Sequence, residues 1–222
     1  MTLTLYFHPF SSFCQKVLIA LYERDVAFAP RIVDLSEAAE RAMLEALSPI
    51  GKFPVLRDEE AGRTIAEASV IVEYLDRFRE SPPLVPGERE AALDVRYWDR
   101  LFDLYVMTPM QKAVADSFRP EGTHDSFGVE EAKAILARSY RIVDEALAQR
   151  QGDWICGPEV TLADCAAAPS LFYAGMVVPF DAYPRLVPYF ARLRARPSFS
   201  RAVDEARPYR AFFPLGWREG WD

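Results

Sequence analysis

Cysteine and histidine are scarce in this sequence of 222 residues. The three cysteines, Cys14, Cys156 and Cys165, are odd in number and too few for a disulfide framework, so we expect a reducing compartment. The two histidines, His8 and His124, have no cluster of cysteine or aspartate at metal-ligand spacing. We therefore predict no metal site.

Basic clusters and long apolar runs are also missing. Lys and Arg number 26 against 33 Asp and Glu, which gives a net charge of −7, and without a basic patch we expect no nucleic-acid partner. No stretch reaches the ~18–20 apolar residues of a membrane span, and the N-terminus has no basic start followed by an apolar run. We expect no membrane association and a cytoplasmic location. With 50% hydrophobic and 27% charged residues, the composition is that of a folded globular protein.

Strands and helices are predicted to alternate over the first eighty residues. Ser11 or Ser12 is placed to cap the first helix after the break at residues 8–10, and Ser36 is placed to cap the second. Apolar periodicity and turn residues give the order βαβαββα. The expected strands are 2–7, 28–35, 53–57 and 64–65, and the expected helices are 11–23, 36–47 and one that begins at 67.

A proline-rich segment at 81–87 is predicted to separate this region from an all-helical one. Adjacent prolines remove backbone donors and fix extended backbone, so a helix cannot run through them. The aromatic tail from residue 207 to 222 is expected to pack back on the helices, because so many rings are unfavourable in water. The expected helices are 88–118, 129–149, 162–178, 184–195 and 198–205.

Four motifs in this order resemble the cytosolic glutathione S-transferase family. They are the turn SSFCQKV at 11–17, the loop SPIGKFPVL at 48–56, the helix start EASVIVEYL at 67–75 and the box TLAD at 161–164. The first is similar to the bacterial, serine-type members of the zeta, theta and omega kind. The resemblance implies an α/β plus all-α fold: a thioredoxin-like βαβαββα domain over 1–80, a linker over 81–87 and an all-helical domain over 88–222.

Ser11 is the candidate catalytic residue. The first turn of a helix offers unpaired N–H groups and the positive end of the helix dipole, which favour an anion such as a thiolate. A free thiol has a pKa of ~8.5, and hydrogen bonds to the thiolate lower that value. Ser11 would therefore stabilise the thiolate of glutathione, although its hydroxyl can equally serve as the helix N-cap. Ser12 and the strand residue Tyr6 are the alternatives for the activating hydroxyl.

Cys14 completes a Ser-x-x-Cys turn that is similar to a thioredoxin CxxC motif with its first cysteine replaced. A two-cysteine disulfide cycle is then impossible within this turn. Because Cys14 falls beside the buried face of the first helix, we interpret it as an inert core thiol in preference to a redox group.

The glutathione contacts implied by the resemblance lie in two further motifs. Phe53 would pair through its backbone with the cysteinyl part of glutathione beside Pro54, a candidate for a cis peptide bond. Lys52 would meet the glycyl carboxylate, or would be an ordinary solvated turn lysine.

Residues 67–69 would hold the γ-glutamyl part. Glu67 would face its amine, or would serve only as a partner of the helix dipole. The serine that usually follows in the family is Ala68 here, so one hydrogen bond of about 0.5–1.5 kcal/mol is missing unless Ser69 supplies it.

An apolar co-substrate would lie in the cleft between the two domains, where ligand sites tend to occur. Five residues are candidates for lining it: Phe10, Tyr105, Met110, Phe118 and Tyr173. The implied activity is attack of the glutathione thiolate on a small, largely apolar electrophile, with glutathione as co-substrate and a homodimer as the assembly. The alternative is a catalytically weak ligand-binding or protein-interaction relative.

Overall fold

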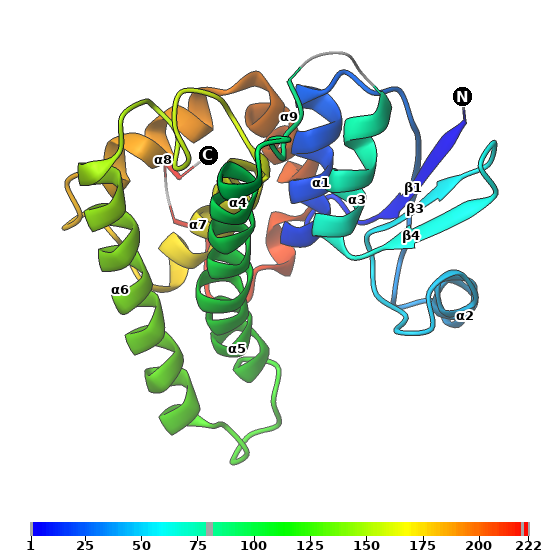
Figure 1. Ribbon diagram of the computed structural model, residues 1–222. Helices are drawn as coiled ribbons and strands as arrows, with labels where there is room; N and C mark the ends of the chain where they lie inside the picture. Colours follow the sequence, from blue (N-terminus) through cyan, green and yellow to red (C-terminus); the bar gives the residue numbers. More distant parts are fainter. Residues whose placement is uncertain (1, 79–81, 219, 222) are drawn as a thin grey trace.

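The N-terminal part of the chain forms a four-stranded mixed sheet with helices on both faces. The computed structural model describes residues 2–78, 82–218 and 220–221 (Figure 1). The strand order is β2-β1-β3-β4, with β1 parallel to β2 and all other pairs antiparallel. The elements are β1 (Leu3–Phe7), α1 (Ser12–Glu23), β2 (Ala29–Ile32), α2 (Ala38–Leu47), β3 (Val55–Asp58), β4 (Arg63–Ala66) and α3 (Ala68–Leu75), followed by a short 3-10 helix, η1 (Asp76–Phe78).

Side-chain alternation along β1 explains why both faces are covered. Leu3, Leu5 and Phe7 are buried in the main core with α1 and α3, whereas Tyr6 packs on the opposite face against a smaller cluster that includes Leu44 of α2. In Figure 1, α1 and α3 lie side by side between the sheet and the other helices, and α2 lies on the far side. The predicted thioredoxin-like order βαβαββα is confirmed.

Two local predictions in this region are wrong. The second strand covers Ala29–Ile32 only, and Ser36 does not cap α2, whose N-cap is Glu37 without a side-chain capping bond. The carboxylate of Asp34 accepts the N–H of Ser36 at 2.8 Å, which forms a turn and delays the start of the helix.

The rest of the chain is helical, as predicted, and is built around α7. This helix contacts α1, α4 and the segment between α4 and α5, and nearly all of its residues are buried. The elements are α4 (Arg89–Leu101), η2 (Phe102–Met107), α5 (Thr108–Asp116), α6 (Ser126–Gln149), α7 (Leu162–Val177), α8 (Leu186–Ala195), α9 (Pro197–Ala206) and the 3-10 helix η3 (Arg207–Phe212).

The predicted helix 88–118 contains a π-helical segment, η2, that the sequence pattern did not reveal. The Thr108 N–H donates to the Asp103 carbonyl, five residues back instead of four. Leu104 and Tyr105 are about half exposed on this segment, whereas Val106 and Met107 are buried.

The aromatic tail packs back on the helices, as predicted, over the residues that are described. Phe213 and Trp221 are buried, and the Trp221 indole donates to the Phe172 carbonyl at 2.7 Å. The predicted domain boundary at residues 80 and 81 lies outside the described residues. Beyond it, the Leu162 N–H at the start of α7 donates to the Leu84 carbonyl at 2.9 Å, so the proline-rich segment is fixed to the central helix.

The predicted capping box at the start of α7 is present. The Asp164 carboxylate accepts the Thr161 N–H at 2.9 Å, the Tyr189 hydroxyl at 2.7 Å and the Ile155 N–H at 3.2 Å. Burial raises the pKa of Asp164, although these donors oppose the effect. The motif therefore stabilises the fold.

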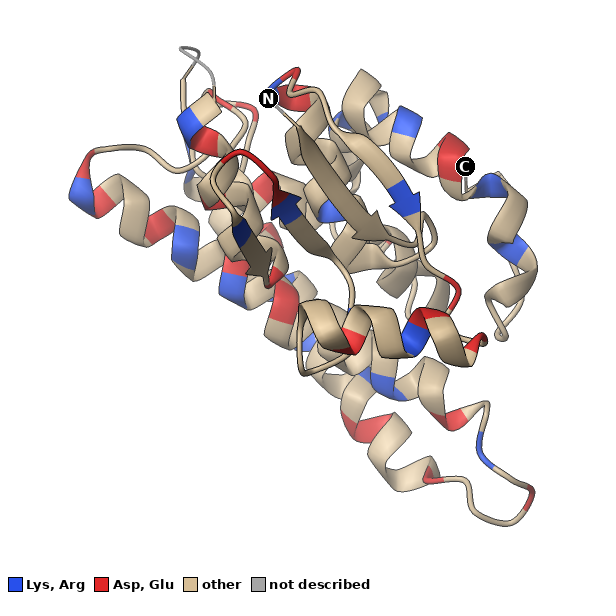
Figure 2. Ribbon diagram, turned by 90° about the vertical axis from the view of Figure 1, so that its right-hand side faces the viewer, with Lys and Arg blue, Asp and Glu red and all other residues tan. Residues whose placement is uncertain are grey.

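Charge is mixed over the surface. Basic and acidic residues alternate along the helices in Figure 2 and do not gather on one face. Among the described residues, no helix combines the length and the apolar character needed to cross a membrane.

Candidate functional site

Strand register brings three predicted site segments to one edge of the sheet. Tyr6 near the end of β1 pairs with Val55 at the start of β3, and Val55 pairs with Ala66 at the end of β4. The segments that follow or precede these residues therefore lie at the same edge. They are residues 8–12, 52–54 and 67–69.

Ser11 lies at the junction of β1 and α1 and is the N-cap of α1. Its N–H donates to the His8 carbonyl at 3.0 Å, and its hydroxyl oxygen accepts the Cys14 N–H at 3.4 Å. A hydroxyl that accepts from the helix still has its own proton to donate. The capping role and the thiolate-stabilising role are therefore compatible. Ser12 is the first residue of α1 and is buried.

The other two groups considered for thiol chemistry are less suitably placed. Cys14 is fully buried, and burial raises its pKa to about 12 although Ser11 acts in the opposite direction, so the thiol is protonated at neutral pH. Tyr6 packs with the cluster on the α2 face of the sheet.

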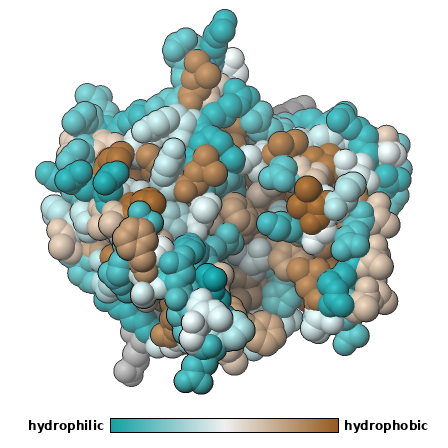
Figure 3. Space-filling model, turned by 90° about the horizontal axis from the view of Figure 1, so that it is seen from below, coloured by the Kyte–Doolittle hydropathy of each residue, from teal (hydrophilic) through white to brown (hydrophobic). Residues whose placement is uncertain are grey.

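An apolar cleft of about 260 Å³ contains Ser11 and Ser12. Seen from below, the molecular surface is hollowed between its two halves (Figure 3). Of the described residues that line the cleft, none is charged. They are Phe10, Ser11, Ser12, Met110, Gln111, Val114, Tyr173, Phe212 and Phe213.

The structure brings three of the five predicted co-substrate residues to this cleft: Phe10, Met110 and Tyr173. It does not bring Tyr105 and Phe118, whose side chains are 55% and 69% exposed. Tyr105 lies in η2, where the π-helical turn changes the direction of successive side chains relative to an α-helix. Phe118 lies beyond the end of α5.

Several residues that shape the cleft were missed in the sequence analysis. Phe212 and Phe213 belong to the aromatic tail. The tail was predicted to pack on the helices, but its contact with this cleft was not predicted. Gln15 donates to the Pro9 carbonyl at 3.0 Å and to the Tyr173 hydroxyl at 3.1 Å, and that hydroxyl donates to the Phe10 carbonyl at 2.9 Å. These bonds fix the turn before Ser11 against α7. The only sign of this role in the sequence was a polar residue, Gln15, at a buried position of the first helix.

His8 lies between the Phe53 loop and the C-terminal aromatic segment. Its ring is 6.2 Å from the Phe53 ring and 4.6 Å from the Tyr209 ring, measured between centroids, and its Nδ1 accepts the Phe10 N–H at 3.2 Å. Burial lowers the pKa of His8, which favours the neutral form. The imidazole therefore links the Phe53 loop to the C-terminal segment.

The predicted glutathione-binding loop contains the cis peptide bond that the sequence suggested. This bond joins Phe53 and Pro54. Phe53 precedes the β3 ladder, which begins at Val55, and Lys52 is exposed at the same loop.

Glu67 makes a sharp connection between β4 and α3. Its backbone angles are φ 71° and ψ 119°, a conformation that is costly for a residue other than glycine and is often found at functional sites. Its carboxylate is exposed and makes no capping bond to α3. Ala68, the first residue of α3, is buried.

The Ser69 hydroxyl is fully engaged. It accepts from Lys16 at 2.9 Å and from Arg100 at 2.6 Å, and it donates to Asp99 at 2.8 Å. A hydroxyl has one proton and two lone pairs, so this set uses its whole capacity.

These contacts belong to a largely buried ionic network between α1, α3, α4 and η2. Lys16 has no exposed surface; its ammonium contacts Asp103 at 2.9 Å and forms a closer ion pair with Asp99. Burial raises the pKa of Asp103, although Lys16 acts in the opposite direction. Two cations, Lys16 and Arg100, thus face two anions, which neutralises the network.

Known families match two parts of the chain. Residues 5–83 match the family described as "Glutathione S-transferase, N-terminal domain", and residues 126–192 match "Glutathione S-transferase, C-terminal domain". The chain belongs to the glutathione S-transferase family.

Individual relatives match nearly the whole chain. A probable maleylacetoacetate isomerase of Vibrio cholerae is 28% identical and covers 94% of this chain and 98% of its own length. A stringent starvation protein A homolog of Histophilus somni is 26% identical over 93% of this chain and 92% of its own. A glutathione S-transferase of Methylobacillus flagellatus, solved with GSH bound, is 29% identical, covers 90% of this chain and 98% of its own, and superposes with a TM-score of 0.82.

The names of these relatives do not agree on one activity. One name is that of an isomerase and another names no reaction, so family membership alone does not choose a reaction. The zeta, theta or omega kind stays a prediction. Among the described residues, no group of three or more His, Cys, Asp or Glu is arranged to hold a metal ion.

Proposed function

We propose that the protein is a glutathione transferase that acts on small, neutral, largely apolar electrophiles. The observation that carries the proposal is the position of Ser11. This residue lies at the sheet edge shared by residues 52–54 and 67–69, and it also lines the apolar cleft. A thiolate stabilised by Ser11 would therefore face a reactant held in the cleft.

In the proposed reaction the Ser11 hydroxyl donates to the sulfur of glutathione and favours the thiolate, whose proton passes to solvent. The sulfur attacks the electrophilic carbon, a C–S bond forms, and the leaving group departs with its electron pair. Phe10, Met110 and Tyr173 contribute apolar surface that holds the electrophile beside the sulfur.

For glutathione we propose the contacts implied by the motifs. Phe53 binds the cysteinyl part through its backbone, beside the cis Phe53–Pro54 bond. Lys52 meets the glycyl carboxylate, and Glu67 meets the γ-glutamyl amine. The N–H groups at the start of α3, at Ala68 and Ser69, favour the remaining carboxylate through the helix dipole.

The test separates binding from turnover. Calorimetric titration with glutathione should show binding at millimolar ligand or below, and an activated aryl halide should be conjugated. Ser11→Ala should lower conjugation by at least about tenfold and raise the pKa of bound glutathione, read from thiolate absorbance against pH. Ser117→Ala, which removes an exposed hydroxyl at the end of α5, is the matched control. Equal activity in the Ser11 variant would assign the role to Ser12 or Tyr6.

A second candidate is a glutathione-binding or interaction protein without turnover. Ala68 has no hydroxyl, and the Ser69 hydroxyl is engaged in the ionic network, which favours weaker glutathione binding. Binding of glutathione without conjugation across a varied panel of electrophiles would support this candidate. Absence of glutathione binding would contradict the transferase and favour an interaction protein that does not use glutathione.

We also propose a homodimer in the cytoplasm. Val70 on α3, Leu93 and Tyr97 on α4, and Leu104 on η2 are each about half exposed, and Leu93 and Tyr97 lie one turn apart on the same face of α4. A second copy of the chain would cover this face. Light scattering should give twice 25.2 kDa, and a mass of 25.2 kDa would refute the dimer.

A further inference from the structure

The first turn of α3 has few side-chain donors for an anion. Ala68 has no polar side chain, Glu67 is itself an anion, and the hydroxyl of Ser69 is engaged with Lys16, Arg100 and Asp99. Only the backbone N–H groups remain to bind a carboxylate there. Their contribution comes from partial charges and is modest.

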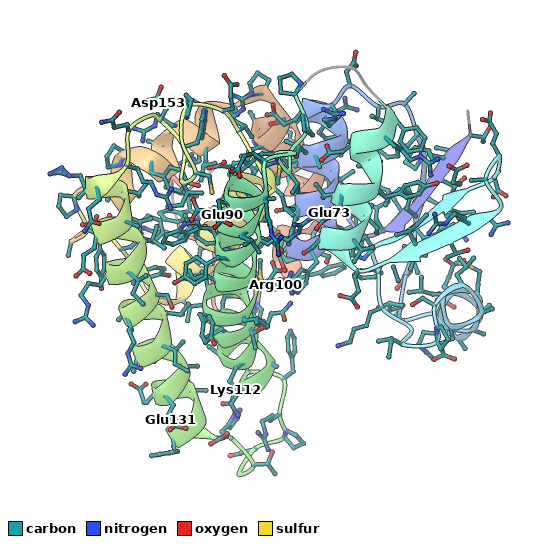
Figure 4. The ribbon with its side chains drawn as sticks, viewed as in Figure 1. Glu73, Glu90, Arg100, Lys112, Glu131 and Asp153 are labelled. Carbon is teal, nitrogen blue, oxygen red and sulfur yellow. The ribbon has the colours of Figure 1, made fainter. Side chains whose placement is uncertain are left out.

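Arg100 brings a full positive charge to this turn from the neighbouring helix. Its Nη2 donates to the Ser69 hydroxyl at 2.6 Å, and its electrostatic interaction reaches Glu67. The side chain is 50% exposed. In Figure 4, Arg100 lies on α4 at the border with α1 and α3.

The Nε and Nη2 donors of the guanidinium are engaged, whereas Nη1 is free over the described part of the chain. Nε donates to Asp99 at 3.2 Å, and Nη2 donates to Asp99 at 2.9 Å and contacts Asp103 closely. Asp99 and Asp103 are themselves held by the buried ammonium of Lys16. Among the described residues, Nη1 has no hydrogen-bond partner.

A guanidinium held through Nε and Nη2 is well suited to bind a carboxylate with the two N–H groups of Nη1. Arginine presents planar, paired donors to carboxylates, and its ordering cost falls when the side chain is held in advance. The network thus orients a cation next to the helix turn that lacks side-chain donors.

We propose that Arg100 binds the α-carboxylate of the γ-glutamyl residue of glutathione and so replaces the side-chain donor that Ala68 cannot supply. The inference rests on the proposed function. Glu67, beside Arg100, takes the α-ammonium, so the zwitterionic end of the tripeptide meets one charge of each sign.

The test compares the binding of two ligands to the wild type and to its variants. The ligands are S-methylglutathione and its analogue S-methyl-(4-aminobutyryl)cysteinylglycine, which keeps the amine but lacks the α-carboxylate. The variants are Arg100→Gln and the matched control Arg96→Gln. Arg96 lies one turn earlier on α4, is 46% exposed, and pairs with Glu73 of α3.

We expect the wild type and Arg96→Gln to prefer S-methylglutathione over the analogue by about tenfold or more. Arg100→Gln should bind the two ligands nearly equally, by loss of affinity for S-methylglutathione alone. Arg100→Lys, which keeps the charge but not the paired donors, should retain part of the preference and shows that the fold tolerates change at this position. In turnover, Arg100→Gln should raise the KM for glutathione with little change in kcat.

Two outcomes would overturn the inference while leaving the proposed function intact. Retained preference in Arg100→Gln would mean that the carboxylate is bound elsewhere. An equal loss of affinity for both ligands would mean that Arg100 only supports the structure. If the wild type binds neither ligand, the proposed function fails, and the inference fails with it.

Discussion

Replacement of Lys16 by methionine is expected to destabilise the protein strongly at neutral pH. The substitution keeps an unbranched side chain of similar length and removes the ammonium. It leaves Asp99 and Asp103, which are 2% and 6% exposed, without their shared buried partner.

The magnitude follows from the burial of the three groups. Removing one partner of a buried ion pair costs about 3–5 kcal/mol, since the remaining charge is desolvated without compensation. Arg100 still contacts both aspartates from its half-exposed position, which places the expected loss near the lower end. For a chain of this length, a loss of ~3 kcal/mol corresponds to a fall of roughly 6–12 °C in Tm.

The assay is urea denaturation at several pH values, with Lys112→Met as the control. Lys112 also pairs with an aspartate, Asp125, but the two side chains are 41% and 36% exposed, and such surface pairs contribute about 0–1 kcal/mol. The control should therefore resemble the wild type.

The pH dependence has a definite sign. Burial raises the folded-state pKa of Asp103 above its ordinary 3.8, and loss of Lys16 should raise it further. A carboxyl group with a raised folded pKa favours the folded state at low pH, and this contribution is lost as pH rises through that pKa. The Lys16→Met penalty should therefore shrink as pH is lowered toward the Asp103 range. Addition of Asp103→Asn should restore part of the stability at neutral pH.

A Lys16→Met loss below about 1 kcal/mol, or one equal to that of Lys112→Met, would refute this reasoning. A penalty that grows on acidification would refute the assignment to buried carboxylates.

Three further predictions concern other parts of the molecule. Burial raises the pKa of Cys14 to about 12, so iodoacetamide at neutral pH should modify it in unfolded but not in folded protein, as read by mass spectrometry; rapid labelling of the folded form would contradict its inert assignment. Gly175→Ala should cost about 1–3 kcal/mol in urea denaturation, because a Cβ there would lie 2.7 Å from Phe180 and still closer to Trp221. Phe213→Ala should change the KM for bulky electrophiles and leave that for glutathione unchanged; a parallel change in both would remove Phe213 from the co-substrate wall.

Local patterns in the sequence predicted the order of the elements well. Apolar periodicity and the placement of proline and glycine are local properties, which is why βαβαββα followed by helices was predicted with boundaries a few residues off. The cis Phe53–Pro54 bond and the Thr161–Asp164 box were also predicted, since each is carried by neighbouring residues.

Features that depend on packing were not predicted. Lys16 and Asp103 are separated by 87 positions, and only the packing of η2 near α1 makes them partners. The tail was expected to pack on the helices, but nothing in its composition indicated that Phe212 and Phe213 would wall the cleft beside Ser11. Tyr105 was a candidate for the cleft, but it lies in η2, and a π-helical segment of this kind is not evident from local sequence.

The π-helical segment has a consequence for how the cleft can vary. A π turn carries one residue more than an α turn, and one residue corresponds to about 100° of rotation about the helix axis. Asp99 lies before η2 and faces the ionic network, whereas Met110, Gln111 and Val114 lie after it and face the cleft. The number of backbone residues in η2 thus sets which side of α5 meets the electrophile. Asp103 of η2 belongs to the network, so insertion or deletion of one residue after Asp103 offers a route to a new co-substrate wall with Asp99 and Asp103 kept in place.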